Sequence, residues 1–378
     1  MSAVLSTLPT IGQRNVQAAV TEAAGAPFVL RDLLISEPRI DEVRVRIVAC
    51  GVCHTDVAMQ ESSTRAPKPI VLGHEGAGVV EAVGSGVEGF ELGDHVVLSY
   101  SWCGHCANCA DGHPAYCRHM NALNFQGARL DGSGALHTVG GQRIRSHFFG
   151  QSSFSTSVIT EVRNLVKVPR HLPLEVMAPL GCGIQTGAGA MLNSLKVRRG
   201  SAVAVFGVGS VGLAAVMAAR LAGARIIVAV DVQPARLALA LELGATAAAN
   251  GSEGDLLQQL SQVLPNGADH ALDTTGREDT LQAAIATLAT GGVCGLVGIA
   301  SRPLAVDTRL LMVGGRSLRG IVEGDSQPQT FIPELIAHYE AGRLPIDRLI
   351  STYPFTQIND AVADMKAGRV IKPVLMMS

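Results

Sequence analysis

The sequence predicts an α/β protein with two domains, one built on a doubly wound parallel sheet and the other mainly β. From about residue 184, strand-like and helix-like runs alternate, which is typical of a parallel sheet with helices on both faces. Residues 70–100 are rich in Gly and Val and are interrupted by glycines, as short strands and turns are. The length of 378 residues fits two domains of about 100–200 residues each.

The alternating half of the chain is regular enough to assign element by element. The strand-like runs are AVAVFG, IIVAVD, HALDTT and VCGLVG, and the helix-like runs are SVGLAAVMAARLAGA, QPARLALALELGA and REDTLQAAIATLA. Two further helices are expected at residues 328–342 and 357–368. Polar and apolar residues alternate over residues 41–50, which predicts a half-buried strand.

Composition excludes several classes of protein. Hydrophobic residues make up 47% and charged residues 16% of the chain, which favours large buried cores over disorder. A net charge of −2 gives no electrostatic basis for binding nucleic acid or an anionic membrane. No signal-peptide pattern is present, so we expect a cytoplasmic protein whose eight cysteines bind metal rather than form disulfides. The uncharged stretch Ser201–Ala219 is about long enough to span a bilayer, but its glycine spacing favours a buried strand followed by a helix.

Four cysteines lie within fifteen residues, at Cys103, Cys106, Cys109 and Cys117. The spacing C-x2-C-x2-C-x7-C lets one loop surround a single tetrahedral ion with four sulfurs. A site closed in this way has no position for substrate, so we expect a structural zinc. Disulfides and an iron–sulfur cluster are the alternatives, and a second group of metal ligands elsewhere in the chain favours zinc.

A glycine-rich loop follows the run AVAVF and opens a helix. Its glycines, Gly207, Gly209 and Gly212, have the G-x-G-x-x-G spacing that allows a tight turn, close approach of a pyrophosphate and close helix–strand packing. The helix N-terminus then offers partial positive charge to the phosphates. The loop therefore predicts a dinucleotide-binding (Rossmann) domain.

The residue that ends the next strand indicates which dinucleotide binds. Asp231 lies 19 residues after Gly212, where its carboxylate accepts hydrogen bonds from the adenosine ribose and repels a 2′-phosphate, so we expect NAD rather than NADP. Arg236 is expected to contact the ribose or to lie on a solvated helix face. An N-cap role for Asp231 is the structural alternative.

A second group of metal ligands is spread along the chain. Cys53, His74 and Cys182 supply two thiolates and one imidazole, which predicts a zinc site with its fourth position open, as catalytic zinc sites have. Such an ion acts as a Lewis acid on a bound alcohol. Thr55 is placed to accept the alcohol proton, and Glu75 is expected beside the ligand His74 as a supporting carboxylate or transient ligand.

These motifs together resemble the zinc-dependent, medium-chain alcohol dehydrogenases along essentially the whole chain. The segment GHEGAGVVEAVGSGV at residues 73–87 matches the zinc signature of that family. The four-cysteine lobe and the GVGSVG loop follow in the order and spacing of the family. Within it, residues 180–195 and 315–326 are similar to the NAD-linked aryl-alcohol (benzyl-alcohol) and geraniol dehydrogenases.

The resemblance implies a GroES-like catalytic domain of residues 1–183 and 327–378 around an NAD-binding domain of residues 184–326. It implies that His54 and Lys372 contact the cofactor pyrophosphate and that Ile299 contacts the cofactor. It also implies a homodimer or homotetramer paired through the NAD-binding domains. Residues expected near the substrate pocket are Thr55, Phe125, Phe154 and Ile299.

One position departs from the family pattern. Many relatives carry a histidine five residues after the first zinc ligand, where it ends a proton relay from the Ser or Thr hydroxyl, and this chain has Ala58. The relay through Thr55 must therefore end on another group or on water.

The function expected from these residues is reversible oxidation of a primary aromatic or allylic alcohol to the aldehyde, with hydride transfer to NAD. A short aliphatic alcohol or a glutathione adduct of formaldehyde is the alternative substrate, and Arg129, Arg143 and Arg145 are the cations available for the adduct. A non-catalytic, zinc-stabilised NAD-binding module is the alternative of another class. A zinc hydrolase would leave the dinucleotide loop without a purpose.

Overall fold

The computed structural model describes residues 14–300 and 302–377, which divide into two compact units. The first contains residues up to 182 together with 328–333 and 350–377, and the second contains residues 183–327 and 334–349. Among the described residues, no helix combines the length and the apolar composition that crossing a membrane requires.

The boundary near the C-terminus differs from the sequence-based division. Residues 334–349, expected in the catalytic domain, group with the second unit. Ile346 and Leu349 are buried, and Arg348 forms an ion pair with Glu242, 2.6 Å away. Helix α11 (Pro328–Glu340) therefore begins in one unit and ends in the other.

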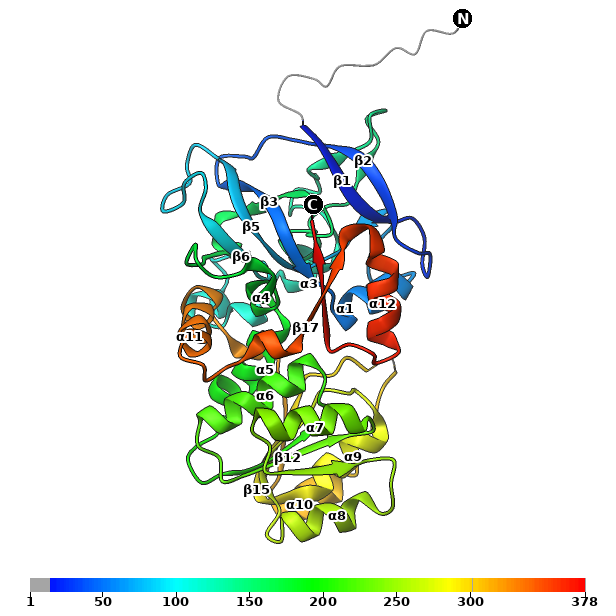
Figure 1. The fold of residues 1–378 in the computed structure, drawn as a ribbon, viewed down its shortest axis with the longest axis vertical. Helices are drawn as coiled ribbons and strands as arrows, with labels where there is room; N and C mark the ends of the chain where they lie inside the picture. The colour runs from blue at the N-terminus through cyan, green and yellow to red at the C-terminus, as the bar shows by residue number, and fades with distance from the viewer. Residues whose placement is uncertain (1–13, 301, 378) are drawn as a thin grey trace, which may run out of the picture. The chain divides into compact units, whose positions relative to one another are not determined.

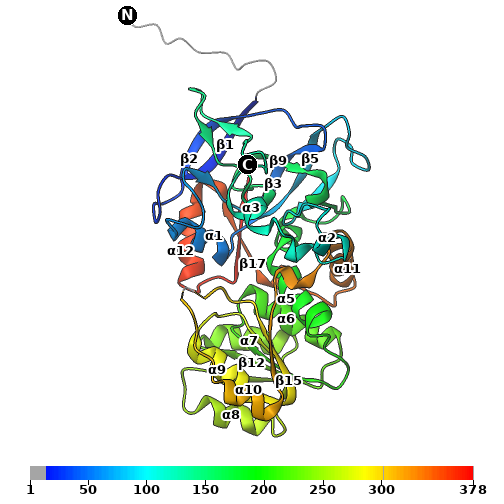
Figure 2. The same ribbon diagram turned by 180° about the vertical axis from the view of Figure 1, so that it is seen from behind.

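The first unit is built on two sheets, as Figures 1 and 2 show from opposite sides. One sheet has the order β4-β1-β2-β7-β8, with strands β1 (Arg14–Thr21), β2 (Val29–Ile35), β4 (Ile70–Val71), β7 (Leu136–His137) and β8 (Arg143–Ile144). The other has the order β10-β6-β5-β3-β18-β17, with β9 also paired to β3. Its strands are β3 (Glu42–Gly51), β5 (Glu75–Val83), β6 (His95–Leu98), β9 (Ser157–Glu161), β10 (Leu165–Lys167), β17 (Ile350–Pro354) and β18 (Lys372–Met376).

The predicted strand at residues 41–50 is confirmed as β3, but its half-buried character is wrong. Nine of its ten residues are buried or partly buried, and Arg46 alone is exposed. The polar residue Arg44 is only 2% exposed and pairs with Glu37 at 2.9 Å and Glu81 at 3.8 Å. Because β3 pairs with β5, β9 and β18, it lies inside the sheet, and the buried charge of Arg44 is matched by carboxylates that reach the solvent, since Glu37 is 51% and Glu81 25% exposed.

Short helices complete the first unit. They are α1 (His54–Glu61), α2 (Ala107–Ala110), α3 (Met120–Phe125), α4 (Leu174–Met177) and α12 (Ile358–Lys366). The helix predicted at 357–368 is thus confirmed, and α12 packs on β17 and β18. Large apolar side chains from both sheets and from α1 and α12 form one core.

The second unit contains a six-stranded parallel sheet with the order β13-β12-β11-β14-β15-β16. In chain order this is 3-2-1-4-5-6, the doubly wound arrangement of dinucleotide-binding domains. The predicted parallel sheet is therefore confirmed. Its strands are β11 (Ala202–Phe206), β12 (Ile226–Asp231), β13 (Ala247–Asn250), β14 (Ala268–Asp273), β15 (Leu288–Leu296) and β16 (Ser317–Gly320).

Helices cover both faces of this sheet. Helix α7 lies toward the viewer in Figure 1, whereas α9 and α10 lie toward the viewer in Figure 2. The helices are α5 (Gly183–Gly189), α6 (Ser210–Leu221), α7 (Pro234–Leu243), α8 (Leu256–Val263), α9 (Glu278–Thr287) and α10 (Thr308–Gly314). The uncharged stretch 201–219 forms β11 and most of α6, as expected.

Candidate metal and cofactor sites

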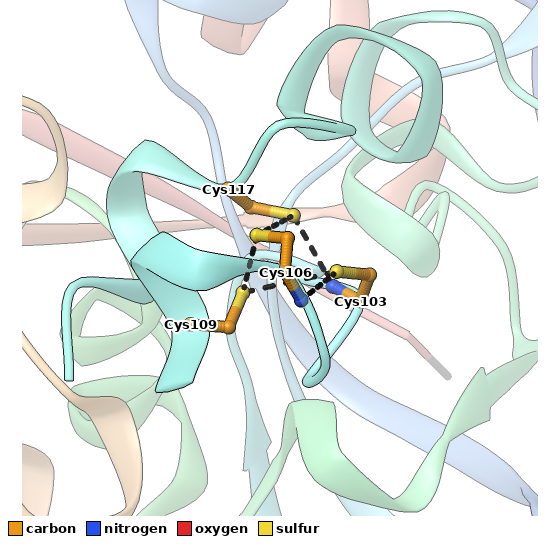
Figure 3. A group of neighbouring side chains, drawn as sticks. All are labelled: Cys103, Cys106, Cys109 and Cys117. Carbon is orange, nitrogen blue, oxygen red and sulfur yellow. Dashed lines mark hydrogen bonds between the residues drawn. The ribbon is translucent and has the colours of Figure 1, made fainter. Parts of the chain in front are cut away.

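The four cysteines of the loop converge on one point. Figure 3 shows the side chains of Cys103, Cys106, Cys109 and Cys117 directed toward one another. The Sγ–Sγ distances are 3.9 Å from Cys103 to Cys109, 3.5 Å from Cys106 to Cys109 and 4.0 Å from Cys106 to Cys117. A tetrahedral ion with Zn–S bonds of about 2.3 Å separates its sulfurs by about 3.8 Å, so the group fits a single zinc.

The alternatives for these cysteines fit less well. None of the eight cysteines forms a disulfide in the structure. An iron–sulfur cluster attaches its cysteines to different irons, which requires wider sulfur separations than those observed. The geometry therefore favours one ion held by four sulfurs.

Backbone amides prepare this loop for negative charge. The amide of Cys106 donates to Cys103 Sγ at 3.3 Å, and the amide of Arg118 donates to Cys106 Sγ at 3.5 Å. The Arg118 amide and that of Cys109 lower the pKa of Cys106 to about 6. Since zinc binds the thiolate, these amides favour the form that the metal needs at Cys106, whereas burial raises the pKa of Cys109 to about 12 and also raises the pKa of Cys117.

The second predicted ligand group also assembles, within the first unit. Cys53 is the N-cap of α1, His74 directly precedes β5, and Cys182 follows a short 3-10 turn. The ligand atoms of these residues and of Glu75 all lie within 4.8 Å of one another. The Nε2 atom of His74 is buried and has no hydrogen-bond partner among the described residues, as expected of a nitrogen directed at a metal.

The pKa shifts of Cys53 and His74 both indicate that this group of side chains attracts positive charge. A hydrogen bond from the Cys182 thiol lowers the pKa of Cys53 well below its usual value, against the opposing effect of burial. Burial acts to lower the pKa of His74, but the charge and hydrogen bond of Asp56 outweigh it and hold that pKa well above the usual value. Positive charge is therefore favoured where the ligand atoms meet.

Asp56 contacts the ligand group, and its sequence position was not among the predicted site residues. Its Oδ1 accepts from His74 Nδ1 at 2.9 Å and from the amide of Gly73 at 3.0 Å, and its Oδ2 accepts from the amide of Cys53 at 2.9 Å. A carboxylate on the second nitrogen fixes the ring and the tautomer of a ligand histidine. The available signal was its place three residues after Cys53, the spacing of a helix capping box.

Glu75 and Lys372 form a buried ion pair beside the ligands. The Lys372 ammonium lies 2.9 Å from each carboxylate oxygen of Glu75 and 3.2 Å from the Val52 carbonyl. The side chain of Lys372 is 3% exposed and that of Glu75 is 0% exposed. The predicted place of Glu75 beside the ligand group agrees with this arrangement, whereas the contact of Lys372 with a cofactor pyrophosphate stays a prediction.

The first turn of α1 carries the other two predicted catalytic residues, since the exposed His54 and the partly buried Thr55 follow the ligand Cys53. Of the two expected pocket phenylalanines, Phe125 is partly buried. Phe154 is fully buried and packs edge-on against Phe28 at 5.5 Å, so core packing accounts for it.

The predicted dinucleotide loop joins β11 to α6 in the second unit. Gly207 has φ 83°, which favours glycine. A Cβ on Gly212 would lie 2.0 Å from the Gly207 carbonyl oxygen, whereas a Cβ on Gly209 would meet nothing within 4 Å. Gly212 thus permits close helix–strand packing. The space at Gly209 fits a cofactor phosphate, as does the buried Ser210 hydroxyl, which has no hydrogen-bond partner among the residues that the structure describes.

Asp231 ends β12, as predicted, and Gln233 rather than Asp231 caps α7. The Asp231 carboxylate accepts from the amide of Val208 at 2.8 Å, which ties the end of β12 to the glycine loop. Arg236 Nη1 lies 3.9 Å from Asp231 Oδ2. Ile299 is 56% exposed in the same unit, and the cofactor contacts predicted for these residues remain predictions.

Comparisons with known proteins cover both units. The profile of the alcohol dehydrogenase GroES-like domain matches residues 39–170, and that of the zinc-binding dehydrogenase family matches residues 210–340. The geraniol dehydrogenase of Castellaniella defragrans is 48% identical over 366 residues, which are 96% of this chain and 98% of that protein.

Solved structures agree with these matches. An alcohol dehydrogenase zinc-binding domain protein from Burkholderia ambifaria is 52% identical, with a TM-score of 0.94 over 97% of this chain and 100% of that one. The benzyl alcohol dehydrogenase of Acinetobacter calcoaceticus is 42% identical, with a TM-score of 0.93 over the same shares. With its assembled ligand groups and its doubly wound sheet, the chain belongs to the zinc-dependent medium-chain alcohol dehydrogenase family.

Proposed function

We propose that the protein is an NAD-dependent dehydrogenase that reversibly oxidises primary aromatic or allylic alcohols to aldehydes. The observation that carries this proposal is the convergence of Cys53, His74 and Cys182, three ligands that would hold a zinc and leave a fourth position for substrate. Similarity to a geraniol dehydrogenase and a benzyl alcohol dehydrogenase supports the substrate class.

The bound ion would supply Lewis-acid polarisation of the substrate oxygen. Asp56 holds the His74 ring through Nδ1, so that Nε2 stays directed at the ion. Thr55 accepts the alcohol proton through its hydroxyl and passes it on, and Ala58 cannot continue the relay because it has no polar group. Thr55 acts as a general base of this path, a role that contributes about 10²–10⁴-fold in rate.

The proposal assigns the cofactor contacts to the residues that the sequence predicts for them. In this proposal, the loop of Gly207, Gly209 and Gly212 approaches the pyrophosphate, and the charge of His54 and Lys372 opposes that of the phosphates. The Asp231 carboxylate accepts from the adenosine ribose and repels a 2′-phosphate, which favours NAD. Arg236 and Ile299 complete the set of proposed cofactor contacts, and the subunits pair as a homodimer or homotetramer.

The test is formation of NADH or NADPH by the purified protein with benzyl alcohol, cinnamyl alcohol, geraniol, ethanol and hydroxymethyl-glutathione, each with NAD and with NADP. We expect the highest kcat/KM with NAD and one of the first three alcohols. Preference for ethanol or the glutathione adduct would contradict the substrate class, and preference for NADP would contradict the role of Asp231.

A matched variant tests the proton path. Thr55→Val removes the hydroxyl and keeps the shape of the side chain, so we expect kcat/KM to fall by about 10²-fold or more while the zinc content stays unchanged. Activity retained in Thr55→Val would show that the alcohol proton leaves by another route.

A further inference from the structure

The buried side-chain amide of Gln151 contacts the backbone of the proposed ligand His74 and has no role in the function described so far. Gln151 is 0% exposed. Its Nε2 donates to the carbonyl oxygens of His74 at 3.1 Å and Ser99 at 3.2 Å. Its Oε1 accepts from the amide of Gly76 at 3.2 Å and from the Ser153 hydroxyl at 2.6 Å.

These four contacts use the full capacity of the side chain, since a primary amide has two donor hydrogens and one carbonyl with two lone pairs. They also fix its orientation. Two backbone carbonyls require the NH2 group on one side, and the amide of Gly76 requires the carbonyl on the other. Gln151 is therefore held in one rotamer and one orientation by the backbone on either side of Glu75.

The amide lies where the strand ladder stops. Strands β5 and β6 pair from Val79 and His95 to Ala77 and Val97. Beyond these pairs, the Gln151 amide donates one hydrogen to the carbonyl of His74, which directly precedes β5. It donates the other to the carbonyl of Ser99, which directly follows β6. It thus continues the connection between the strands past the last backbone pair, at the position of the ligand His74.

Ser99 extends this connection to a second ligand. Its hydroxyl donates to the carbonyl of Gly181 at 2.8 Å, and Gly181 directly precedes the ligand Cys182. There is no room for a side chain at Gly181, because a Cβ would lie 2.1 Å from the Leu98 carbonyl oxygen. A path of three hydrogen bonds therefore runs from the backbone of His74 through Gln151 and Ser99 to the residue before Cys182.

We propose that Gln151 is a positioning residue which, through Ser99, sets the separation of the zinc ligands His74 and Cys182. Asp56 holds the ring of His74, and Gln151 holds its backbone. The two ligands are far apart in the chain and both lie outside the strands of the described residues, and this side-chain path fixes the one relative to the other. Removal of residues that orient metal ligands typically changes metal affinity or activity by about 10- to 100-fold.

The inference rests on the proposed zinc site, so its test reads the metal as well as turnover. Gln151→Met keeps the length of the side chain and removes all four hydrogen bonds, and Ser99→Ala removes the hydroxyl bonded to Gly181. The full-length protein is prepared with cobalt in the site of Cys53, His74 and Cys182. Its visible spectrum, the rate of zinc release to a chelator and kcat/KM are then measured.

We expect both variants to shift the cobalt spectrum and to release zinc from this site about 10- to 100-fold faster. The double variant should differ little from the stronger single one, since residues of one network are not additive. Asn124→Leu is the matched control. Asn124 is another fully buried amide of the same unit, bonded to Ser101 and Met120, and its loss should lower thermal stability without changing the cobalt spectrum.

The outcomes separate the proposals. An unchanged cobalt spectrum and release rate in Gln151→Met, or an equal change in Asn124→Leu, would overturn the positioning role. If Gln151→Met does not fold, Ser99→Ala alone decides in the same way. Shifted spectra in a protein that oxidises no alcohol would support the positioning role and refute the proposed function.

Discussion

Replacing Lys372 with Met tests how the buried ion pair beside the ligands is stabilised. The ammonium is 2.9 Å from both oxygens of Glu75, and neither side chain has appreciable exposure. At 2.9 Å and an effective dielectric constant of about 20, the attraction is about 6 kcal/mol. The cost of removing both charges from water offsets most of it, so the pair is close to neutral as a whole but costly to break.

Lys372→Met removes the cation and leaves a buried carboxylate without its partner. We expect the free energy of unfolding to fall by about 3–5 kcal/mol at pH 7, and the thermal midpoint to fall on the order of 10 °C. Glu75→Gln with Lys372→Met removes both charges, so the double variant should be more stable than Lys372→Met alone. The assay is urea unfolding of zinc-saturated protein for the wild type, both single variants and the double variant.

The pH dependence of the stability of Lys372→Met provides a second, independent test of the ion pair. Burial raises the pKa of Glu75 from the usual 4.5, and the charge of Lys372 opposes this rise. Without Lys372 the pKa rises further. A raised folded-state pKa contributes stability that is present below pH 4.5 and is lost as the pH rises through the folded pKa. The deficit of Lys372→Met should therefore shrink as the pH falls from 7 to 5. A loss below about 1 kcal/mol, or a double variant that costs the sum of the singles, would refute this account.

Four further variants test other parts of the structure. Cys109→Ser should cost the protein one of its two expected zinc ions and lower its thermal midpoint, as metal analysis and calorimetry would detect; full zinc content would disprove a four-sulfur site. Burial lowers the pKa of His147 to about 3, so the unfolded state binds the extra proton between about pH 6.5 and 3, and stability falls by about 1.4 kcal/mol per pH unit as the pH drops through that range. His147→Gln should remove this slope, and an unchanged slope in acid unfolding would refute the assignment. Gly209→Ala should keep the thermal midpoint and weaken NAD binding, measured by calorimetry, whereas Gly212→Ala should impair both, because its Cβ would clash with the backbone; equal effects of the two would argue against a cofactor at Gly209.

The sequence predicts the parallel sheet and the ligand groups well because their signals are local. The four cysteines lie in one loop, and the glycine loop carries its strand and helix on either side, so spacing alone determines their neighbours. Strand β3 is a case in which the local sequence pattern predicts burial incorrectly. The alternation of DEVRVRIVAC indicates one solvent-exposed face, but on that face Glu42 and Arg44 are each only 2% exposed and Arg46 alone stays exposed.

Residues that orient ligands are harder to predict, because their partners are distant in the chain. Asp56 is near Cys53 in sequence, yet its bond to His74 spans 18 residues. Gln151 contacts His74 across 77 residues and Ser99 across 52. Glutamine at such a position has no spacing rule, and only the folded arrangement gives it a role.

The ligand site therefore depends on two kinds of information. Cys53, His74 and Cys182 determine which ion can bind, and the sequence contains that directly. The distances among them depend on polar side chains that end or bridge strands, because each ligand lies at the end of an element rather than within one. A chain that kept the three ligands but lost Asp56 or Gln151 would still match the sequence pattern, yet we expect it to hold the metal more weakly.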